Sequence, residues 1–455
     1  MPQRPLELAL VGAGPRGELN LGAVVELYPK HLKFIAVAEA NEARRERFIR
    51  RFGIPREKAF RSWEEMMAAP QAAEAIINAL PCRMHYASTI AALARGYHVL
   101  LEKPVAHTPG ECVGLQRAAE AHGKIFMVSL QSRYNRIYRR MKELIDAGKI
   151  GPVAHVDAIE HMGYYQFTSM FVRGAHANSH HSHSLMMAKG VHDVDMVNWL
   201  VGSRAKRVSS FGATTHFLAA HAPAGAPDYC VDGCPAAETC PFNAVRDYYK
   251  PGRPVVPFAL LRKGLSYELA RDLIRIPRMR SLAALSTEDP SMEGRKKALH
   301  GRYGRCVYRC DNDVIDRQTT NIEYENGVVA SVVVAGLTAL WERWINLGGP
   351  AGEILSKDFS GDLELRTYRP ARVSRERFPF NVLKHGGGDD ALLLDFAHQV
   401  RHGRPGEALG SIGNTVESHL IGLAAEQSRR SGEVVDMDAF RLAAEAEAPS
   451  FAPAG

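Results

Sequence analysis

Short apolar runs alternate with stretches of helical periodicity over about the first 130 residues. Five apolar runs have the length of buried parallel strands, and they lie at 6–11, 33–38, 75–80, 97–101 and 124–129. Helical patterns separate them, from a glycine turn to about Tyr28 and at 42–52, 86–95 and 109–122. Strands that alternate with helices at this spacing predict a Rossmann-type, doubly wound parallel α/β sheet, and we assign residues 1–135 to this domain.

The pattern changes after a helix expected at 136–148. Further strands are expected at 152–160, 205–217, 341–347 and 363–367, and helices at 190–201, 389–402 and 411–431. Two alternating segments, 317–325 and 328–335, flank Asn326-Gly327, which is a strong hairpin signal. These elements predict an α+β domain with a largely antiparallel open sheet over residues 136–445, and a frayed tail at 446–455.

Two parts of this second domain lack regular periodicity. A His-rich stretch at 163–184 is expected to form a loop. Residues 218–304 are rich in Pro, Gly and Arg, and we interpret them as an irregular insertion with helices only around 257–276 and 280–286.

Composition excludes several classes of protein. The chain has 455 residues, 46% of them hydrophobic, and no apolar run reaches the roughly 18 residues that a membrane span needs. MPQRPLELALVGAG leads directly into the first strand and leaves no room for a signal peptide, so we expect a cytoplasmic protein. The net charge of +7 suits an anionic cofactor or substrate. Because no DNA-reading motif accompanies that charge, we predict no nucleic-acid partner.

A glycine-rich turn follows the first strand and opens a helix. Gly12-x-Gly14-x-x-Gly17 has the spacing of a dinucleotide fingerprint, with Pro15 and Arg16 between the last two glycines. The glycines would permit a tight turn, a close approach of the backbone to a pyrophosphate, and close packing of helix on strand. The helix N-terminus would offer free N–H groups and a positive dipole to the phosphates.

Glu39 ends the second strand, 22 residues after Gly17. A carboxylate at that point can accept hydrogen bonds from both ribose hydroxyls of NAD, and it disfavours the 2′-phosphate of NADP. Arg44 and Arg45 lie close enough in the sequence to offset part of this effect. We therefore expect NAD as the cofactor, with NADP possible.

Five segments carry a more specific pattern: VGAGPRG at 11–17, AVAE at 36–39, INALPCRMH at 77–85, GYHVLLEKP at 96–104 and GVHDVDMVNWLVG at 190–202. GDDALLLDFAHQVRHG at 388–403 and the stretch from ESHL to GEVVDM continue it, whereas 218–304 is the least typical part. Together they resemble the Gfo/Idh/MocA oxidoreductases, a family named for glucose-fructose oxidoreductase and inositol dehydrogenase.

The resemblance implies that the open sheet of the second domain covers the nicotinamide and holds a sugar, a polyol or a related substrate. It also implies a homodimer or homotetramer, because exposed sheets in this family usually pair between subunits. The implied cofactor contacts are Gly12, Gly14, Pro15, Arg16, Gly17, Glu39, Asn78, Leu80, His85, Glu102, Lys103 and Gln131. The implied substrate contacts are Lys103, Arg133, Tyr134, Arg173, His176, Lys189 and His192.

Two of these residues match the catalytic positions of the family. Lys103, in Glu102-Lys103-Pro104, follows a parallel strand at the edge where open α/β sheets bind ligands. A cationic amine there would stabilise the alkoxide-like charge that develops as hydride leaves a carbinol. His192 matches the proton acceptor, and its ordinary pKa near neutrality suits a general base.

One departure from the family pattern concerns the residue four positions before His192. Many members have an aspartate there, whereas this chain has Ala188, followed by Lys189. Either His192 works without the aspartate, or Lys189 contributes a second cation that would suit an anionic substrate. Lys189 could equally be a solvated lysine at a helix start.

Histidines and cysteines offer further candidates. His176, His180, His181 and His183 share a loop with Arg173 and could bind a divalent metal or a polyhydroxylated ligand. Their spacing matches no zinc template, so we favour substrate contacts and assign no metal ligands. Cys230, Cys234 and Cys240 lie within eleven residues, with Cys306 and Cys310 further on. They could hold zinc or an iron–sulfur cluster, but the spacing is not standard, and packed free cysteines are the favoured interpretation.

Three functions are compatible with this pattern. The first is hydride transfer between NAD(P) and a carbinol of a sugar, polyol or sugar derivative. The second is a redox-neutral, NAD-dependent hydrolysis or elimination of a glycoside through transient sugar oxidation. The third is a non-catalytic dinucleotide sensor, which retention of Lys103 and His192 disfavours.

Overall fold

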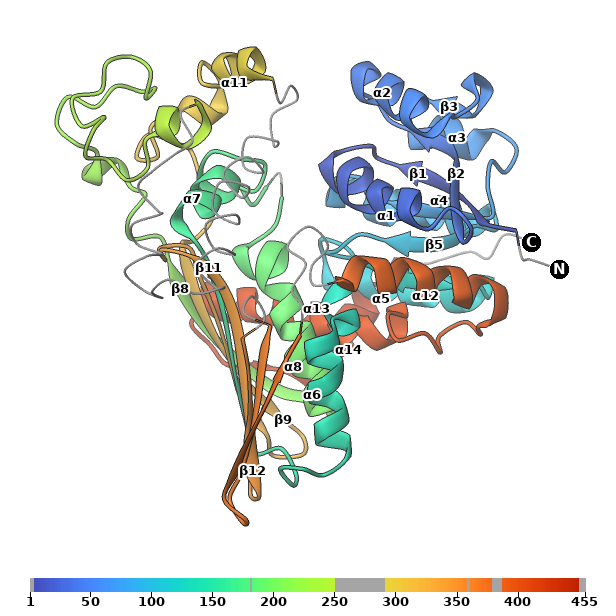
Figure 1. Cartoon of the computed structure of the whole chain (residues 1–455), viewed down its shortest axis with the longest axis vertical. Coiled ribbons are helices and arrows are strands. Elements are labelled where there is room, and N and C mark those ends of the chain that lie inside the picture. The colour runs from blue at the N-terminus through green and yellow to red at the C-terminus, as the bar shows by residue number, and fades with distance from the viewer. Residues whose placement is uncertain (1–3, 181, 250–290, 358–360, 379–386, 450–455) are drawn as a thin grey trace.

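Two sheets organise the chain, each with helices packed on it (Figure 1). The computed structural model describes residues 4–180, 182–249, 291–357, 361–378 and 387–449. Within these ranges no helix has both the length and the hydropathy needed to cross a membrane. The two-sheet architecture confirms the predicted fold class.

The first sheet is parallel throughout, with the strand order β3-β2-β1-β4-β5-β6. Its strands are β1 (Leu6–Val11), β2 (Leu32–Ala38), β3 (Ala59–Phe60), β4 (Ala75–Asn78), β5 (His98–Leu101) and β6 (Phe126–Val128). The accompanying helices are a π-helical segment (Pro15–Leu21), α1 (Gly22–Leu27), α2 (Glu42–Phe52), α3 (Trp63–Ala68), α4 (His85–Ala94) and α5 (Pro109–His122). The predicted strands were found; β3 and α3 were missed because two and six residues are too short to show periodicity.

The second sheet has nine strands in the order β14-β13-β12-β11-β7-β10-β9-β8-β15. They are β7 (His155–Met162), β8 (Ala205–Ala213), β9 (Arg317–Tyr324), β10 (Val329–Ala335), β11 (Trp341–Gly349), β12 (Gly352–Lys357), β13 (Asp362–Thr367), β14 (Arg372–Arg377) and β15 (Val435–Asp436). Among the described strands of this second sheet, only β10 and β7 pair in parallel. The predicted hairpin at Asn326-Gly327 joins β9 to β10. Buried residues alternate with more exposed ones along both strands, so one face of the sheet is open.

Helices cover the other face of this sheet, on the side that faces the first domain (Figure 1). The helices of the second half are α6 (Arg136–Asp146), α7 (Tyr164–Phe167), α8 (Val191–Val201), α11 (Met292–Ala298), α12 (Gly388–His402), α13 (Ile412–Ser431) and α14 (Met437–Glu447). Two π-helical segments, Thr168–Val172 and Met186–Gly190, continue α7 and precede α8.

Several local expectations were wrong. The stretch predicted as a loop at 163–184 begins with α7 and its π-helical continuation. The chain from 446 to 447, predicted to fray, belongs to α14, and a Cβ on Gly110 of α5 would lie 2.7 Å from the carbonyl oxygen of Glu447. The strands β12 and β14 were also missed. The helices expected at 257–276 and 280–286 fall outside the described residues.

Helix α12 packs on the first sheet, although it follows the second sheet in the sequence. Its buried Leu392, Leu393 and Phe396 join the core formed by Leu6, Leu8 and other residues of the Rossmann domain. The boundary predicted at residue 135 therefore does not separate two independent cores; it stays a prediction of where the chain leaves the first sheet.

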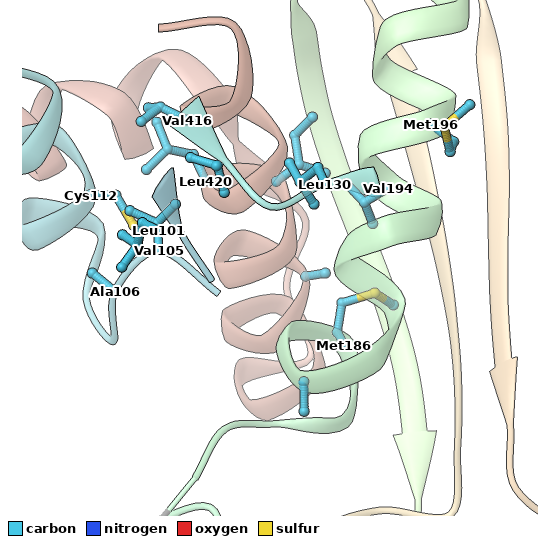
Figure 2. Close-up of a cluster of buried hydrophobic side chains, with 14 of the residues drawn as sticks. Leu101, Val105, Ala106, Cys112, Leu130, Met186, Val194, Met196, Val416 and Leu420 are labelled. Atoms are coloured by element: carbon cyan, nitrogen blue, oxygen red, sulfur yellow. The ribbon is translucent and has the colours of Figure 1, made fainter. Parts of the chain in front are cut away.

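A second core lies between the domains (Figure 2). Leu101 and Val105 from the end of β5 and the loop after it approach Leu420 of α13, while Met186 and Val194 flank α13 from the other side. This apolar contact fixes the tip of β5 relative to the start of α8, and the candidate site lies at that junction.

We expect Phe396→Ala to destabilise the whole protein, because it would empty a fully buried position in the core under α12. A buried Phe→Ala replacement costs about 3–5 kcal/mol. Phe211, which is 69% exposed on β8, offers the matched control. Thermal unfolding should show a clear fall in Tm for Phe396→Ala and almost none for Phe211→Ala; equal effects would contradict the packing of α12.

Candidate functional site

The glycine turn has the shape that a pyrophosphate requires. Gly12 has φ +92°, and a Cβ on it would lie 2.7 Å from the carbonyl oxygen of Ala79. A Cβ on Gly17 would lie 2.4 Å from the carbonyl oxygen of Gly12. Gly14 differs, because no atom lies within 4 Å of its Cβ position. The first two glycines are therefore needed by the fold itself, whereas Gly14 keeps space open at the start of the helix.

Glu39 lies beside this turn at the end of β2. Its Oε2 accepts a hydrogen bond from the backbone N–H of Ala13 at 2.7 Å, and its Oε1 accepts one from Asn41 at 2.9 Å. Arg45 donates to the backbone carbonyl of Glu39 and not to its carboxylate. The carboxylate is thus held next to the turn, in the place where a ribose would contact it.

The side chain of Arg16 forms hydrogen bonds and ion pairs with other residues of the protein. Its Nε donates to Glu102 and its Nη2 to Asp389, both at 2.7 Å, and Nη2 also approaches Ser129 Oγ at 3.2 Å. Burial works against the charge, but Asp389 and Glu102 outweigh it and raise the pKa of Arg16. Arg16 therefore joins the glycine turn to β5 and α12, and its contact with a cofactor stays a prediction.

The loops after β4 and β5 are cross-linked by buried polar side chains. Asn78 donates to Ser88 at 2.8 Å and to Thr89 at 3.0 Å, which anchors the end of β4 on α4. His85 bridges the two loops, with Nε2 2.9 Å from the carbonyl oxygen of Leu80 and Nδ1 2.8 Å from that of Pro104. Burial lowers the pKa of His85. These predicted cofactor residues shape the loops around the site.

Lys103 is the central cation of the site. Its Nζ donates to the backbone carbonyl of Ala188 at 2.6 Å, across the junction between the domains. Burial lowers the pKa of Lys103 to about 8, and the nearby Lys189 contributes to the decrease while Glu102 opposes it. Lys103 is therefore still mainly protonated at neutral pH, but it loses its proton far more readily than a solvated lysine.

His192 lies one helical turn after Ala188, in the first turn of α8, and is 5% exposed. The lysine at the edge of the first sheet thus contacts the helical segment that also carries the histidine. The family's aspartate would stand at 188; here the backbone carbonyl of that residue receives the lysine instead.

Lys189 turns away from solvent into a buried charge network. Its Nζ lies 3.0 Å from Glu160 Oε1 and 4.2 Å from the centre of the Trp341 ring. Arg343 Nε lies 2.8 Å from Glu160 and 2.7 Å from Asp193. Burial opposes the charge of Glu160, but Arg343 and Lys189 outweigh it and lower its pKa, whereas burial raises the pKa of Asp193. Lys189 is thus not a solvated lysine; its contact with substrate stays a prediction.

Three further predicted contacts are engaged in packing. Arg133, 3% exposed, forms a two-pronged ion pair with Asp195 at 2.7 and 2.8 Å. Tyr134 donates to Asp395 at 2.7 Å, and Gln131 is buried beside it. These bonds hold the segment after β6 against α8 and α12, and contacts of Gln131, Arg133 and Tyr134 with cofactor or substrate stay predictions.

The His-rich stretch divides into separate environments. Arg173 is buried and donates to the carbonyl oxygens of Arg305 and Phe242, both at 2.7 Å, so it contacts the insertion. His176 pairs with Ser182, and burial lowers its pKa to about 4. His180 is exposed, and His181 lies outside the described residues. Substrate contacts by Arg173 and His176 remain predictions.

His183 takes part in a cluster that the sequence did not reveal. Its ring stacks on that of His107 at 3.8 Å, and His107 Nε2 lies 3.0 Å from Cys82 Sγ. One possible ligand atom from each of the three residues lies within 4.8 Å of the others. His107 and His183 line a cavity of about 570 Å³ that extends to α13 and α14 and does not include Lys103 or His192. Three widely separated segments supply the cluster, so no spacing motif could predict it.

The sheet order, the open glycine turn and the carboxylate at the end of β2 define a dinucleotide-binding Rossmann protein with a second sheet domain. The family model described as the oxidoreductase family with an NAD-binding Rossmann fold matches residues 6–130, and the GFO/IDH/MocA C-terminal domain matches 138–231. The chain belongs to the GFO/IDH/MocA oxidoreductase family, which confirms the resemblance and the NAD-type cofactor.

Individual relatives are distant. YteT of Bacillus subtilis is 25% identical over 331 residues, which cover 68% of this chain and 69% of YteT. Inositol 2-dehydrogenase 3 of Saccharopolyspora erythraea is 31% identical over 123 residues, 26% of this chain and only 32% of that enzyme.

Solved structures share the fold over nearly the whole chain. An oxidoreductase from Agrobacterium radiobacter in complex with NAD+, L-tartaric acid and magnesium has a TM-score of 0.66 at 15% identity, covering 95% of this chain and 99% of that one. Levoglucosan dehydrogenase in complex with NADH and levoglucosan has a TM-score of 0.67 at 18% identity, covering 95% and 100%.

We expect Gly14→Ala to weaken NAD binding by about tenfold or more without changing stability, because its Cβ would enter space kept open for the pyrophosphate. Gly12→Ala should instead lower Tm, since φ +92° and the nearby Ala79 carbonyl disfavour any side chain. Calorimetric NAD titration and thermal unfolding of both variants separate the two effects. Unchanged NAD affinity in Gly14→Ala would contradict the assigned pyrophosphate site.

Proposed function

We propose that this protein is an NAD-dependent dehydrogenase that moves hydride between the nicotinamide and a carbinol of a sugar, a polyol or a sugar derivative. The observation that carries the proposal is the partly buried ammonium of Lys103. It lies at the carboxyl edge of the Rossmann sheet, with a pKa lowered to about 8, against the helical segment that also carries His192.

The reaction requires one place for the hydride and one for the proton. In the oxidative direction the C–H bond of the carbinol breaks, its electron pair leaves with the hydrogen, and the hydroxyl proton passes to His192. Bound NAD accepts that hydride. Lys103 stabilises the negative charge that grows on the oxygen, and a partly desolvated ammonium does so more strongly than one in water.

Replacement of the family's aspartate by Ala188 changes how the lysine is held. A backbone carbonyl orients the ammonium through a 2.6 Å hydrogen bond but carries no net charge. Lys103 therefore lacks a carboxylate at this contact that would raise its pKa, and Lys189 lowers it further. We propose that this geometry keeps the pKa of Lys103 low. Its ammonium can then stabilise the negative charge that develops on the substrate oxygen.

The names of relatives support the substrate class. Inositol 2-dehydrogenase 3 and levoglucosan dehydrogenase are named for ring compounds with several hydroxyl groups. We propose a substrate of that kind, with NAD preferred to NADP because Glu39 would repel a 2′-phosphate.

We expect Lys103→Met to reduce kcat about 100-fold or more, as loss of one oxyanion-stabilising donor does elsewhere. NAD affinity should change far less, because the glycine turn and Glu39 are untouched. Stopped-flow detection of NADH with a panel of sugars, polyols and glycosides measures the first quantity, and calorimetry the second. Lys142→Met, on the outer surface of α6 beside Asp146, is the control.

Two results of the same experiment would contradict the proposal. Consumption of a glycoside without accumulation of NADH would indicate the redox-neutral reaction. Ligand binding with no turnover of any compound in the panel, unaffected by Lys103→Met, would indicate a dinucleotide sensor.

We expect the rate of substrate oxidation to fall as pH rises through about 8, because Lys103 then loses the proton that makes it cationic. Removing the neighbouring charge in Lys189→Met should raise the pKa of Lys103 and move this alkaline limb to higher pH. The pH profile of kcat for the wild type, Lys189→Met and Lys142→Met checks the assignment. An alkaline limb that does not move in Lys189→Met would show that another group controls it.

A further inference from the structure

The cluster of Cys82, His107 and His183 joins the first sheet to the second domain. Cys82 begins the turn after β4, His107 lies in the loop between β5 and α5, and His183 belongs to the His-rich stretch before α8. The contact of 3.0 Å between Cys82 Sγ and His107 Nε2, and the stacking of the two imidazole rings at 3.8 Å, bring one possible ligand atom of each residue within 4.8 Å of the others. Neither the proposed hydride transfer nor the cofactor site uses these three side chains.

The two loops that carry Cys82 and His107 are held in place by other hydrogen bonds. The ring of His85 links them, because each of its nitrogens bonds to a carbonyl oxygen of one loop. Glu111 Oε2 accepts a hydrogen bond from the backbone N–H of His107 at 3.0 Å, which fixes the chain just before α5. The thiol and the first imidazole therefore keep their relative position without help from a bound ion.

The third member, His183, has a buried nitrogen that the described residues do not satisfy. Its side chain belongs to a residue that is 5% exposed, and within the described ranges Nε2 has no hydrogen-bond partner. Leaving a buried polar atom without a partner costs free energy, and a bound water or ion is a common reason for such an atom in a native protein. This is an observation, separate from the clustering itself, that points to a ligand at this place.

The types of side chain in the cluster decide which ion it suits. One thiolate and two imidazoles are ligands that zinc prefers, and many zinc sites have three protein ligands and a water in the fourth position. With Zn–S about 2.3 Å and Zn–N about 2.0–2.1 Å, tetrahedral ligand atoms lie about 3.3–3.6 Å apart. Since the atoms of the cluster already lie within 4.8 Å of one another, small side-chain movements bring them to these distances.

The surroundings leave room for a fourth ligand. His107 and His183 line the cavity of about 570 Å³, and Ser179, Ser182 and Ser184 line it with them. An ion held by the two histidines therefore sits at the wall of this cavity. Its remaining coordination position is open to a water molecule or a small oxygen ligand from the cavity.

Zinc has to displace a proton from the thiol. Burial raises the pKa of Cys82 to about 12, so the metal-free protein keeps that proton. A thiol that coordinates a metal ion is deprotonated outright by the charge of the ion. The imidazoles need no such change, because a neutral imidazole nitrogen is the form that binds metal.

This set of residues differs from the groups that the sequence suggested. Of the four histidines in the His-rich stretch, His183 alone belongs to it within the described residues, so the spacing of that stretch gave no sign of it. All seven cysteines of the protein are free. The four in the insertion line a separate, much smaller cavity with mainly apolar walls: Cys230, Cys234, Cys240 and Cys306.

We propose that Cys82, His107 and His183 bind one Zn²⁺ ion, whose fourth coordination position opens to the cavity. Binding forms one Zn–S and two Zn–N bonds, and the thiol proton of Cys82 leaves to solvent. The ion fixes the His-rich stretch of the second domain to the loops after β4 and β5. This proposal is independent of the proposed dehydrogenase activity.

The test uses the full-length protein without a metal-binding tag, both as isolated and after removal of metal with a chelator and addition of zinc. We expect elemental analysis to find about one zinc per chain after this addition. Cobalt(II) bound in place of zinc should give the charge-transfer absorption of a thiolate–metal bond, which reports directly on Cys82.

Variants of the cluster and matched controls identify the ligands. Cys82→Ser and His183→Ala should weaken zinc binding at least as much as the about 10–100-fold that loss of a supporting residue costs. Cys82→Ser should also lose the charge-transfer absorption. Cys310→Ser and His180→Ala should bind zinc like the wild type, because the Cys310 thiol donates to the Cys306 carbonyl at 3.3 Å and His180 is exposed in the same stretch as His183.

Measurements on the wild type decide the matter even if a variant fails to fold. A protein that retains no zinc after its addition would overturn the proposal, and so would copper or iron bound in place of zinc in the isolated protein. A cobalt-loaded protein without the thiolate absorption would exclude Cys82 as a ligand. Equal loss of zinc in His180→Ala and His183→Ala, or in Cys310→Ser and Cys82→Ser, would overturn the assigned ligand set.

Discussion

The hydrogen bond from Lys103 to the carbonyl of Ala188 joins the two domains where the chemistry is proposed to occur. It exists because the tip of β5 and the helical segment before α8 are held in a fixed relation by an apolar core. Leu101, Met186 and Leu420 from three parts of the chain meet there (Figure 2). Any movement that opened this core would separate the lysine from the helix that carries His192.

The electrostatics of the site follow from burial. Lys103, Lys189 and Arg343 bring three positive charges into a largely buried region, where Lys189 and Arg343 pair with Glu160 and Arg343 also pairs with Asp193. Burial and the charge of Lys189 lower the pKa of Lys103, Glu102 opposes them only in part, and the hydrogen bond of Lys103 goes to a neutral carbonyl. An ammonium whose pKa is lowered in this way is stabilised when negative charge develops on a substrate oxygen beside it. We propose that the alanine at 188 and the lowered pKa of the lysine belong to one arrangement.

The sequence could predict elements with strong local signals. Helix α5 at 109–122 was located to the residue, since Thr108 and Glu111 form a capping box and Gly123 ends the helix in a left-handed conformation. The glycine turn and the parallel sheet were also predicted correctly from local sequence patterns. Contacts between distant segments were not, which is why the packing of α12 on the first sheet and the partners of Arg16 and Arg173 required the structure.

The most direct test of the account is a crystal structure with NADH bound. We predict the pyrophosphate at Gly14, the adenine-side ribose on Glu39, and the nicotinamide beside Lys103 on the side of α8 that carries His192. A dinucleotide bound elsewhere, or a nicotinamide remote from Lys103 while the lysine keeps its bond to Ala188, would contradict the central claim.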